Sequence, residues 1–290
     1  MFETLSRSWE LAKLSYSILW QNKKLVIFPL VSGIATLVVM ISFLMPLWAT
    51  GTLESWQASL DQEQPGEQNV AMYVVLFVFY FVNYFLIVFF NSGLIACTMQ
   101  ALRGEQPDIG AGLSAAMRRL PQIFGWALLS ACVGVLLRMI ENSHKRAAQI
   151  LAAILGTAWT AMTYFVVPAI VMEGLGPLAS IKASLANLRK IWGEALVSNF
   201  SIGFITFLIG LPVILLGGFL AYLGIQSGSS VGMVLGVSAA VILLVLLALA
   251  SSAADTILKG LLYSYATGRD VPTDIDTAQL QDAFVHRDQR

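Results

Sequence analysis

The dominant pattern along the chain is a series of apolar stretches without charged residues, separated by polar connections. A transmembrane helix needs about 20 consecutive, mostly apolar residues. Six windows of this kind occur, at residues 25–48, 70–91, 120–138, 147–172, 195–223 and 231–254. We therefore predict an all-α, polytopic helical membrane protein whose six transmembrane helices form three hairpins.

Two boundaries in this prediction depend on few residues. The third window is just long enough, and Arg138 and Glu141 close it with long side chains that can extend to the membrane interface. No charge occurs from Ala195 to Ala254, so the polar residues 226–230 divide this stretch into a fifth and a sixth helix. Pro212 lies within the fifth helix, which favours a kink near its middle, as in helices that line a substrate cavity.

A second pattern repeats before each hairpin: a short amphipathic stretch that ends in two adjacent basic residues. The amphipathic stretches are residues 3–22, 109–120 and 178–191. Their apolar positions recur at helical spacing, which predicts helices lying in the membrane interface. The basic pairs are Lys23 and Lys24, Arg118 and Arg119, and Arg189 and Lys190. We interpret these pairs as candidate contacts for anionic lipids.

Each hairpin is also followed by a glycine and, a few residues later, a proline. Glycine can end a helix and proline can begin one. The residues are Gly104 and Pro107, Gly174 and Pro177, and Gly268 and Pro272. Two explanations stay open: descent of three copies from one unit, or three elbows that any protein of three hairpins requires. Either way, we expect the three interfacial helices to form a collar around the bundle.

The distribution of Lys and Arg predicts the orientation, because these residues mark the cytoplasmic loops. Basic residues concentrate on one side of the predicted topology, and only Arg138, Lys145 and Arg146 lie on the other. Both termini are therefore expected in the cytoplasm. We expect residues 1–268 to form a single membrane domain with a short polar tail at 269–290, and the first span to act as an uncleaved signal anchor. A mitochondrial presequence is the weaker alternative, because Glu3 and Glu10 do not suit one.

Composition agrees with a membrane protein and excludes an ordinary soluble domain. Hydrophobic residues make up 57% of the 290 residues and charged residues 12%, about half of the roughly 25% usual in soluble proteins. The mean hydropathy is +0.76. The formal net charge is zero, so no overall field attracts nucleic acid and we expect no nucleic-acid partner.

The sequence holds no recognisable catalytic or metal-binding pattern. Cys97 and Cys132 lie in apolar runs, and neither His144 nor His286 has a ligand at metal-binding spacing. No phosphate-binding glycine loop, HExxH pair or GxSxG nucleophile turn occurs. We therefore predict a protein that is not an enzyme, without catalytic residues, cofactor or metal.

Polar residues inside the spans are the remaining candidates, because burying them in a bilayer is costly and often functional. Asn83 lies in the middle of the second span, where we expect an interhelical hydrogen bond. Asp255 and Lys259 are four residues apart near the end of the sixth, a spacing that lets them neutralise one another. A structural pair is the simpler interpretation and an ion relay the alternative. Asn199 is a further candidate in the fifth span.

Several phrases of the sequence resemble a known family. Residues 8–11 (SWEL), 20–30 (WQNKKLVIFPL) and 266–268 (ATG) are similar to a prokaryotic family of six-span membrane proteins of unknown function. The layout of basic elbows also resembles the membrane domain attached to some glycerophosphodiester phosphodiesterases. Neither resemblance supplies catalytic residues, and together they imply a bacterial cytoplasmic-membrane protein.

These observations lead to two hypotheses for function. In the first, the protein is non-enzymatic and its interfacial helices bind or organise anionic lipids, or a membrane partner protein, at the cytoplasmic face. In the second, it transports a small solute or ion through a cavity between the second, fifth and sixth spans. A homo-oligomer is compatible with both.

Overall fold

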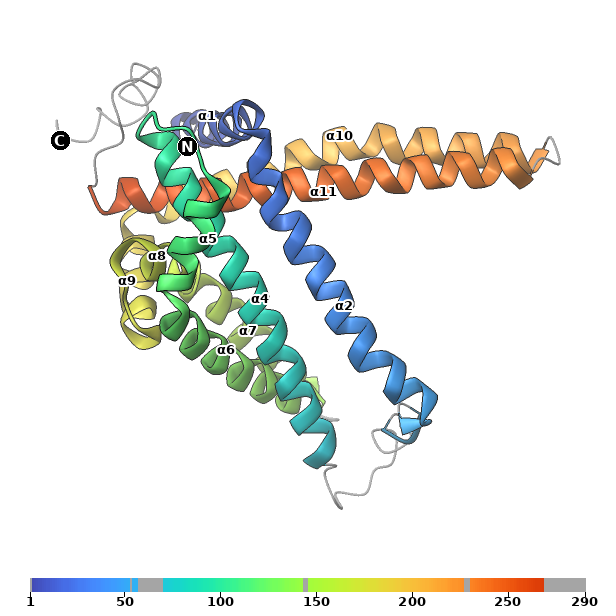
Figure 1. Ribbon diagram of the computed structural model, residues 1–290, viewed down its shortest axis with the longest axis horizontal. Coiled ribbons are helices and arrows are strands. Elements are labelled where there is room, and N and C mark those ends of the chain that lie inside the picture. The colour runs from blue at the N-terminus through green and yellow to red at the C-terminus, as the bar shows by residue number, and fades with distance from the viewer. Residues whose placement is uncertain (1, 53, 57–69, 143–145, 227–229, 269–290) are drawn as a thin grey trace. The chain divides into compact units, whose positions relative to one another are not determined.

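The computed structural model describes residues 2–52, 54–56, 70–142, 146–226 and 230–268 (Figure 1). Helices account for nearly all of these residues, and the described part contains no strand. The helices are α1 (Phe2–Gln21), the 3-10 helix η1 (Lys23–Val26), α2 (Ile27–Ala49), α4 (Val70–Leu102), α5 (Ile109–Arg118), α6 (Leu120–Glu141), α7 (Arg146–Met162), α8 (Val166–Glu173), α9 (Pro177–Lys190), α10 (Trp192–Gln226) and α11 (Ser230–Ala266). The predicted tail at 269–290 lies outside the described residues.

Six helical segments are long and apolar enough to cross a membrane, which confirms the predicted class. They cover Lys23–Ala49, Val70–Leu102, Leu120–Glu141, Arg146–Glu173, Ser201–Gly224 and Val231–Ala266. Two helices extend beyond their predicted ends, α4 by eleven residues and α11 by twelve. Both extensions lack proline, and each helix ends shortly before a glycine in the left-handed conformation, Gly104 or Gly268.

By internal contacts the chain forms two compact units. Unit 1 consists of residues 1–29, 98–107 and 191–290, and unit 2 of residues 30–97 and 108–190. The predicted single membrane domain thus comprises two separately packed parts.

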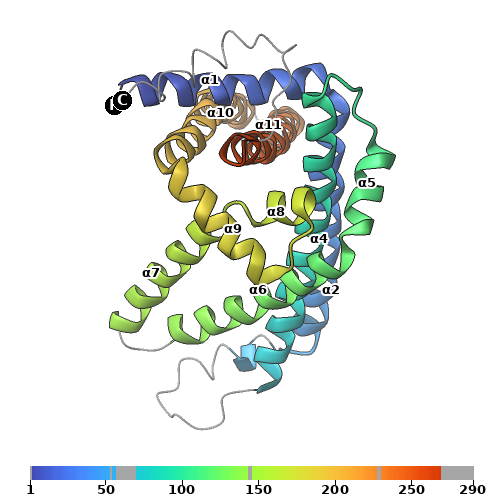
Figure 2. The same ribbon diagram turned by 90° about the vertical axis from the view of Figure 1, so that its left-hand side faces the viewer.

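Unit 2 packs around a cluster of buried apolar side chains from four helices. Val88 of α4, Ala116 of α5, Ile123 and Trp126 of α6, and Ile170 of α8 form its centre. Helices α6 and α7 lie side by side (Figure 2). Their indole rings stack there, with the centroids of Trp126 and Trp159 5.7 Å apart and the planes 6° from parallel.

The fourth span is interrupted, which the sequence analysis did not foresee. Helix α7 ends at Met162 and α8 begins at Val166, with a turn between them. A side chain of another helix stabilises the turn. The amide of buried Phe165 donates a hydrogen bond of 2.9 Å to the hydroxyl of buried Ser184 on α9. Helix α10, by contrast, is one helix through Pro212. The break in the helix therefore lies in the fourth span, whereas the fifth is uninterrupted at Pro212 and its predicted kink stays a prediction.

Unit 1 is built on a hairpin of α10 and α11, which run side by side (Figure 1). Gly210, Gly217 and Gly224 face α11 at intervals of seven residues. A methyl group on Gly217 would collide with the Ala240 methyl, and one on Gly224 would meet the Met233 backbone at 2.6 Å. The two helices are thus so close at Gly217 and Gly224 that a larger residue there would push them apart.

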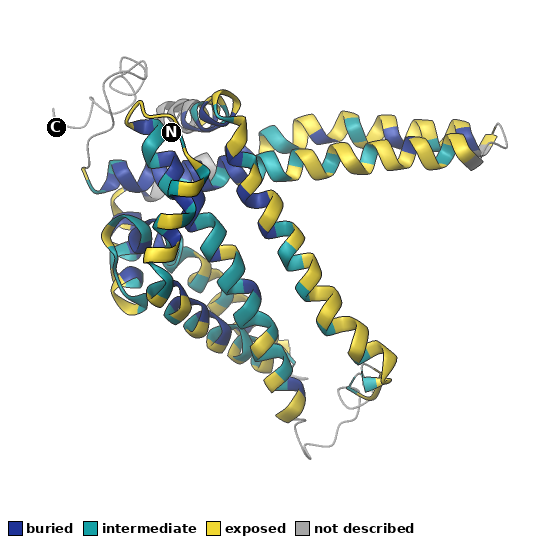
Figure 3. Ribbon diagram, in the orientation of Figure 1, coloured by how far each residue is buried: buried dark blue, intermediate teal, exposed yellow. Residues whose placement is uncertain are grey.

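The two ends of α11 have different surroundings (Figure 3). Near Ser230 its apolar side chains are exposed, as expected for a helix that faces lipid. From Ala253 to Ala266 most positions are buried, including Tyr263 at 0% exposure. Helix α1, η1 and the end of α4 surround this segment, where the Ser264 hydroxyl lies 3.4 Å from the Met99 sulfur. This buried end is the core of unit 1.

Candidate functional site

All three predicted elbows adopt the same backbone conformation. Gly104, Gly174 and Gly268 have φ angles of +74°, +71° and +64°, in the left-handed region that favours glycine. Each follows the last turn of a span. Glycine therefore ends these helices for a conformational reason, as the sequence pattern predicted.

The prolines that follow the glycines serve different purposes. Pro177 is the first residue of α9, a position where its missing N–H costs nothing. Pro107 instead precedes Asp108, whose Oδ2 accepts a hydrogen bond of 2.7 Å from the Ala111 amide and caps α5. The second and third amphipathic helices therefore begin by different mechanisms.

Each basic pair lies at the junction between an amphipathic helix and a span. Lys23 and Lys24 occupy η1 between α1 and α2, and the other pairs lie where α5 meets α6 and where α9 meets α10. Five of the six side chains are exposed, and Arg119 is half-buried. The structure thus gives all three pairs the same local position.

Arg119 differs from the other five because it lies against an elbow glycine. Its guanidinium packs against Gly174, the left-handed residue that ends α8, so closely that a methyl group there would collide with it. A cation at a helix C-terminus is favoured by the helix dipole. Arg119 therefore stabilises the second elbow and is the least accessible of the six to a lipid.

The first pair includes an aromatic neighbour. Lys23 Nζ lies 4.7 Å from the centroid of the Trp20 ring, a cation–π distance, and Trp20 is 75% exposed. Tryptophan and lysine are both enriched at membrane interfaces. This end of α1 has the chemistry expected at the level of lipid head groups.

Asp255 and Lys259 form an ion pair on α11. Lys259 Nζ lies 2.7 Å from Asp255 Oδ2, with both side chains about a third exposed. Asp255 Oδ1 is buried and has no hydrogen-bond partner among the described residues. The spacing therefore predicted the pair, whereas a role in transport stays a prediction.

A chain of hydroxyl groups lies one turn from this pair and connects three helices of unit 1. Thr206 of α10 donates to the Ile202 carbonyl at 2.8 Å. Its oxygen then accepts from the Tyr16 phenol of α1 at 3.1 Å and from Ser251 of α11 at 2.7 Å. Ser251 and Asp255 are four residues apart and share a face of α11.

Asn83 is buried as predicted, but its hydrogen bond is not the expected one. Its Nδ2 donates to the Phe79 carbonyl of the same helix at 2.8 Å. Its Oδ1 has no partner in the described part of the chain. The predicted interhelical bond is therefore wrong for Nδ2, because the local carbonyl one turn back satisfies it. The Asn199 side chain lies outside what the structure describes.

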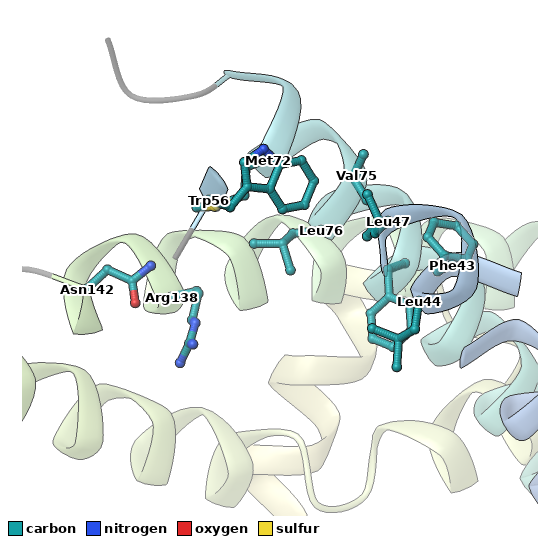
Figure 4. Close-up of a pocket in the computed structure, with 10 residues that line it drawn as sticks. Phe43, Leu44, Leu47, Trp56, Met72, Val75, Leu76, Arg138 and Asn142 are labelled. Carbon is teal, nitrogen blue, oxygen red and sulfur yellow. The ribbon is translucent and has the colours of Figure 1, made fainter. Parts of the chain in front are cut away.

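A cavity of about 440 Å³ lies among α2, α4 and α6 of unit 2 (Figure 4). Its walls are apolar, and Arg138 and Asn142 of α6 lie at one side. Such a volume falls within the roughly 300–1,000 Å³ of small-molecule sites. Among the residues described, no three His, Cys, Asp or Glu side chains gather to hold a metal ion.

Comparison with protein families identifies the family of this chain. The model of a family of unknown function, DUF6159, matches residues 70–271. The chain belongs to the DUF6159 family. The resemblance to a six-span family of unknown function is thereby confirmed, and the likeness to phosphodiesterase membrane domains stays a prediction. No curated protein matches the sequence.

The DUF6159 match begins at Val70, so it covers the second and third amphipathic stretches with their hairpins. It also includes the elbows at Gly104 and Gly174, each of which is followed by a described amphipathic helix. Two features of this region were not predicted from the sequence. Nothing in the sequence around Ser184 indicates its contact, whereas the seven-residue spacing of Gly210, Gly217 and Gly224 is visible in the sequence.

Proposed function

We propose that this DUF6159 protein is a non-enzymatic, multi-pass protein of the prokaryotic cytoplasmic membrane that binds anionic lipids at its cytoplasmic face. Both termini lie in the cytoplasm in this proposal. One observation carries it: a basic pair stands at each junction between an amphipathic helix and a span.

The geometry of the pairs supports head-group binding. An amphipathic helix in the interface places the residues at its end at head-group level. Each Lys or Arg near an anionic membrane surface contributes about 1 kcal/mol. The exposed side chains are Lys23, Lys24, Arg118, Arg189 and Lys190. The Trp20 ring beside Lys23 is suited to the same depth.

Native mass spectrometry of the detergent-released protein with anionic phosphatidylglycerol tests this proposal. We expect Lys23→Glu with Lys24→Glu, and separately Arg189→Glu with Lys190→Glu, to lower the number of retained lipids. Arg118→Glu replaces only the exposed member of the second pair, because Arg119 holds the Gly174 elbow.

Lys13→Glu and Lys182→Glu are the matched controls, since both are exposed lysines within α1 and α9 but away from the junctions. If the controls lower retention as much as the pairs do, the pairs are not the site. Unchanged retention in folded pair variants would contradict lipid binding altogether and favour a partner protein.

Transport of an ion or small solute is the second candidate, and Asp255 favours it. A buried carboxylate oxygen without a partner, one turn from three linked hydroxyls, is suited to holding a cation. Ion and solute flux into liposomes is the measurement, with Asp255→Asn and Asn83→Ala as variants. Flux no greater than that of protein-free vesicles over a broad panel would exclude this function.

A further inference from the structure

The cavity in unit 2 is a groove with one polar side. Phe43, Leu44 and Leu47 of α2 form one wall, and residues of α4 from Met72 to Phe79 form the other. Figure 4 shows these apolar side chains opposite Arg138 and Asn142, which project from the end of α6. Trp56 lines the same end.

The groove extends along α4 for about two thirds of the depth of one lipid leaflet. Its lining residues on α4 run from Met72 to Phe79, a rise of about 10 Å at 1.5 Å per residue. Half of a hydrocarbon core is about 15 Å. The Phe43 ring of α2 packs edge to face on Phe79 with centroids 5.6 Å apart, and these two rings join the walls at the deep end.

The charges at the shallow end are balanced. Arg138 Nη1 donates to Glu141 Oε2 at 2.8 Å, and both side chains are about half exposed. Arg138 retains further N–H donors, and Asn142 follows Glu141 at the end of α6. The groove thus offers donors for a phosphate, and the carboxylate paired with Arg138 lies next to the lining and leaves this end without net charge.

We propose that this groove binds a zwitterionic phospholipid that carries a primary ammonium, with one acyl chain between α2 and α4. The phosphate contacts Arg138 and Asn142, and the ammonium contacts Glu141. The apolar walls match part of an acyl chain, and the neutral Arg138–Glu141 pair beside them matches a head group with one negative and one positive charge. This site differs from the basic junctions in residues and in lipid class.

Competition between two lipids tests the proposal. The whole protein is released in mild detergent and given equal amounts of phosphatidylethanolamine and phosphatidylglycerol with identical acyl chains, and bound lipid is counted by native mass spectrometry. We expect one phosphatidylethanolamine per protein to be retained, in addition to any phosphatidylglycerol at the basic junctions. Retention of no phosphatidylethanolamine, or retention that Arg138→Gln and Leu76→Trp leave unchanged, would overturn the proposal.

Three variants address the three parts of the site. Arg138→Gln should lower phosphatidylethanolamine occupancy about tenfold, because a hydrogen bond to a charged group is worth about one decade of affinity. Leu76→Trp should fill the groove and displace phosphatidylethanolamine. Glu141→Gln leaves the positive charge of Arg138 without its carboxylate partner, so the groove should then prefer the anionic phosphatidylglycerol.

Arg146→Gln is the matched control, since Arg146 is exposed at the start of α7 and does not line the groove. If it acts as Arg138→Gln does, binding is not at the groove. Leu76→Trp and Glu141→Gln keep the test decisive if Arg138→Gln fails to fold. The Arg189→Glu, Lys190→Glu variant should retain phosphatidylethanolamine, which separates failure of this site from failure of the proposed function.

Discussion

The Ser184 hydroxyl accepts the hydrogen bond of the Phe165 amide, and this contact joins α9 to the interruption of the fourth span. Because both residues are buried, removing the hydroxyl leaves an amide without a partner. We expect Ser184→Ala to destabilise the protein by about 1–3 kcal/mol. Thermal unfolding in detergent measures this, with Ser114→Ala on the exposed face of α5 as the control. Equal melting temperatures for the two variants would show that the bond does not hold the turn.

Neighbouring glycines of α10 should respond in opposite ways to the same substitution. Gly217→Ala places a methyl against the Ala240 methyl and should lower the melting temperature. Gly218→Ala meets open space and gains up to about 1 kcal/mol of helix propensity, so it should be neutral or stabilising. Ala240→Gly should restore the Gly217→Ala variant. A failure of that rescue would contradict the close approach of the two helices.

The elbow glycines differ in what surrounds them. Gly104 and Gly174 both have positive φ, so alanine costs about 1–2 kcal/mol at either position. At Gly174 alanine also displaces the Arg119 guanidinium, whereas at Gly104 a methyl meets nothing within 4 Å. We expect Gly174→Ala to lower the free energy of unfolding more than Gly104→Ala does. Denaturant unfolding in detergent compares the two variants. Equal losses of unfolding free energy would show that Arg119 does not stabilise the Gly174 elbow.

Thr206 connects α1 to the hairpin of unit 1 through its hydroxyl oxygen. Thr206→Val keeps the shape but removes the acceptor of Tyr16 and Ser251, so two hydroxyls lose a partner. We expect a loss of about 1–3 kcal/mol. Thr206→Ser, which keeps the acceptor, should retain most of the stability. Tyr16→Phe should add little to Thr206→Val in a double-mutant cycle.

Local spacing was enough to predict much of this fold. The apolar windows, the Gly104, Gly174 and Gly268 elbows and the Asp255–Lys259 pair each depend on residues close in sequence. Periodicity and helix-ending chemistry determine such features. The basic junctions were predicted for the same reason, because each is defined by the helix before it and the span after it.

Features that depend on distant residues were not predictable in this way. Tyr16 and Thr206 are 190 residues apart, and nothing near either one indicates the other. Ser184 looks like any serine of an amphipathic helix until the fold brings Phe165 to it. The groove beside Arg138 likewise needs three helices that are separate in sequence.

The length of α11 has a consequence for how unit 1 meets a bilayer. Its 37 residues extend about 55 Å, against a hydrocarbon core of about 30 Å. Tilt alone would have to exceed about 50°, beyond the usual range of 0–40°. About 15 residues must therefore leave the hydrocarbon without a break in the helix. The buried segment Ala253–Ala266 accounts for them, since there protein replaces lipid around the same rigid rod. Hydrophobic mismatch is thus resolved by the fold itself, and α11 is a membrane anchor at one end and a structural core at the other.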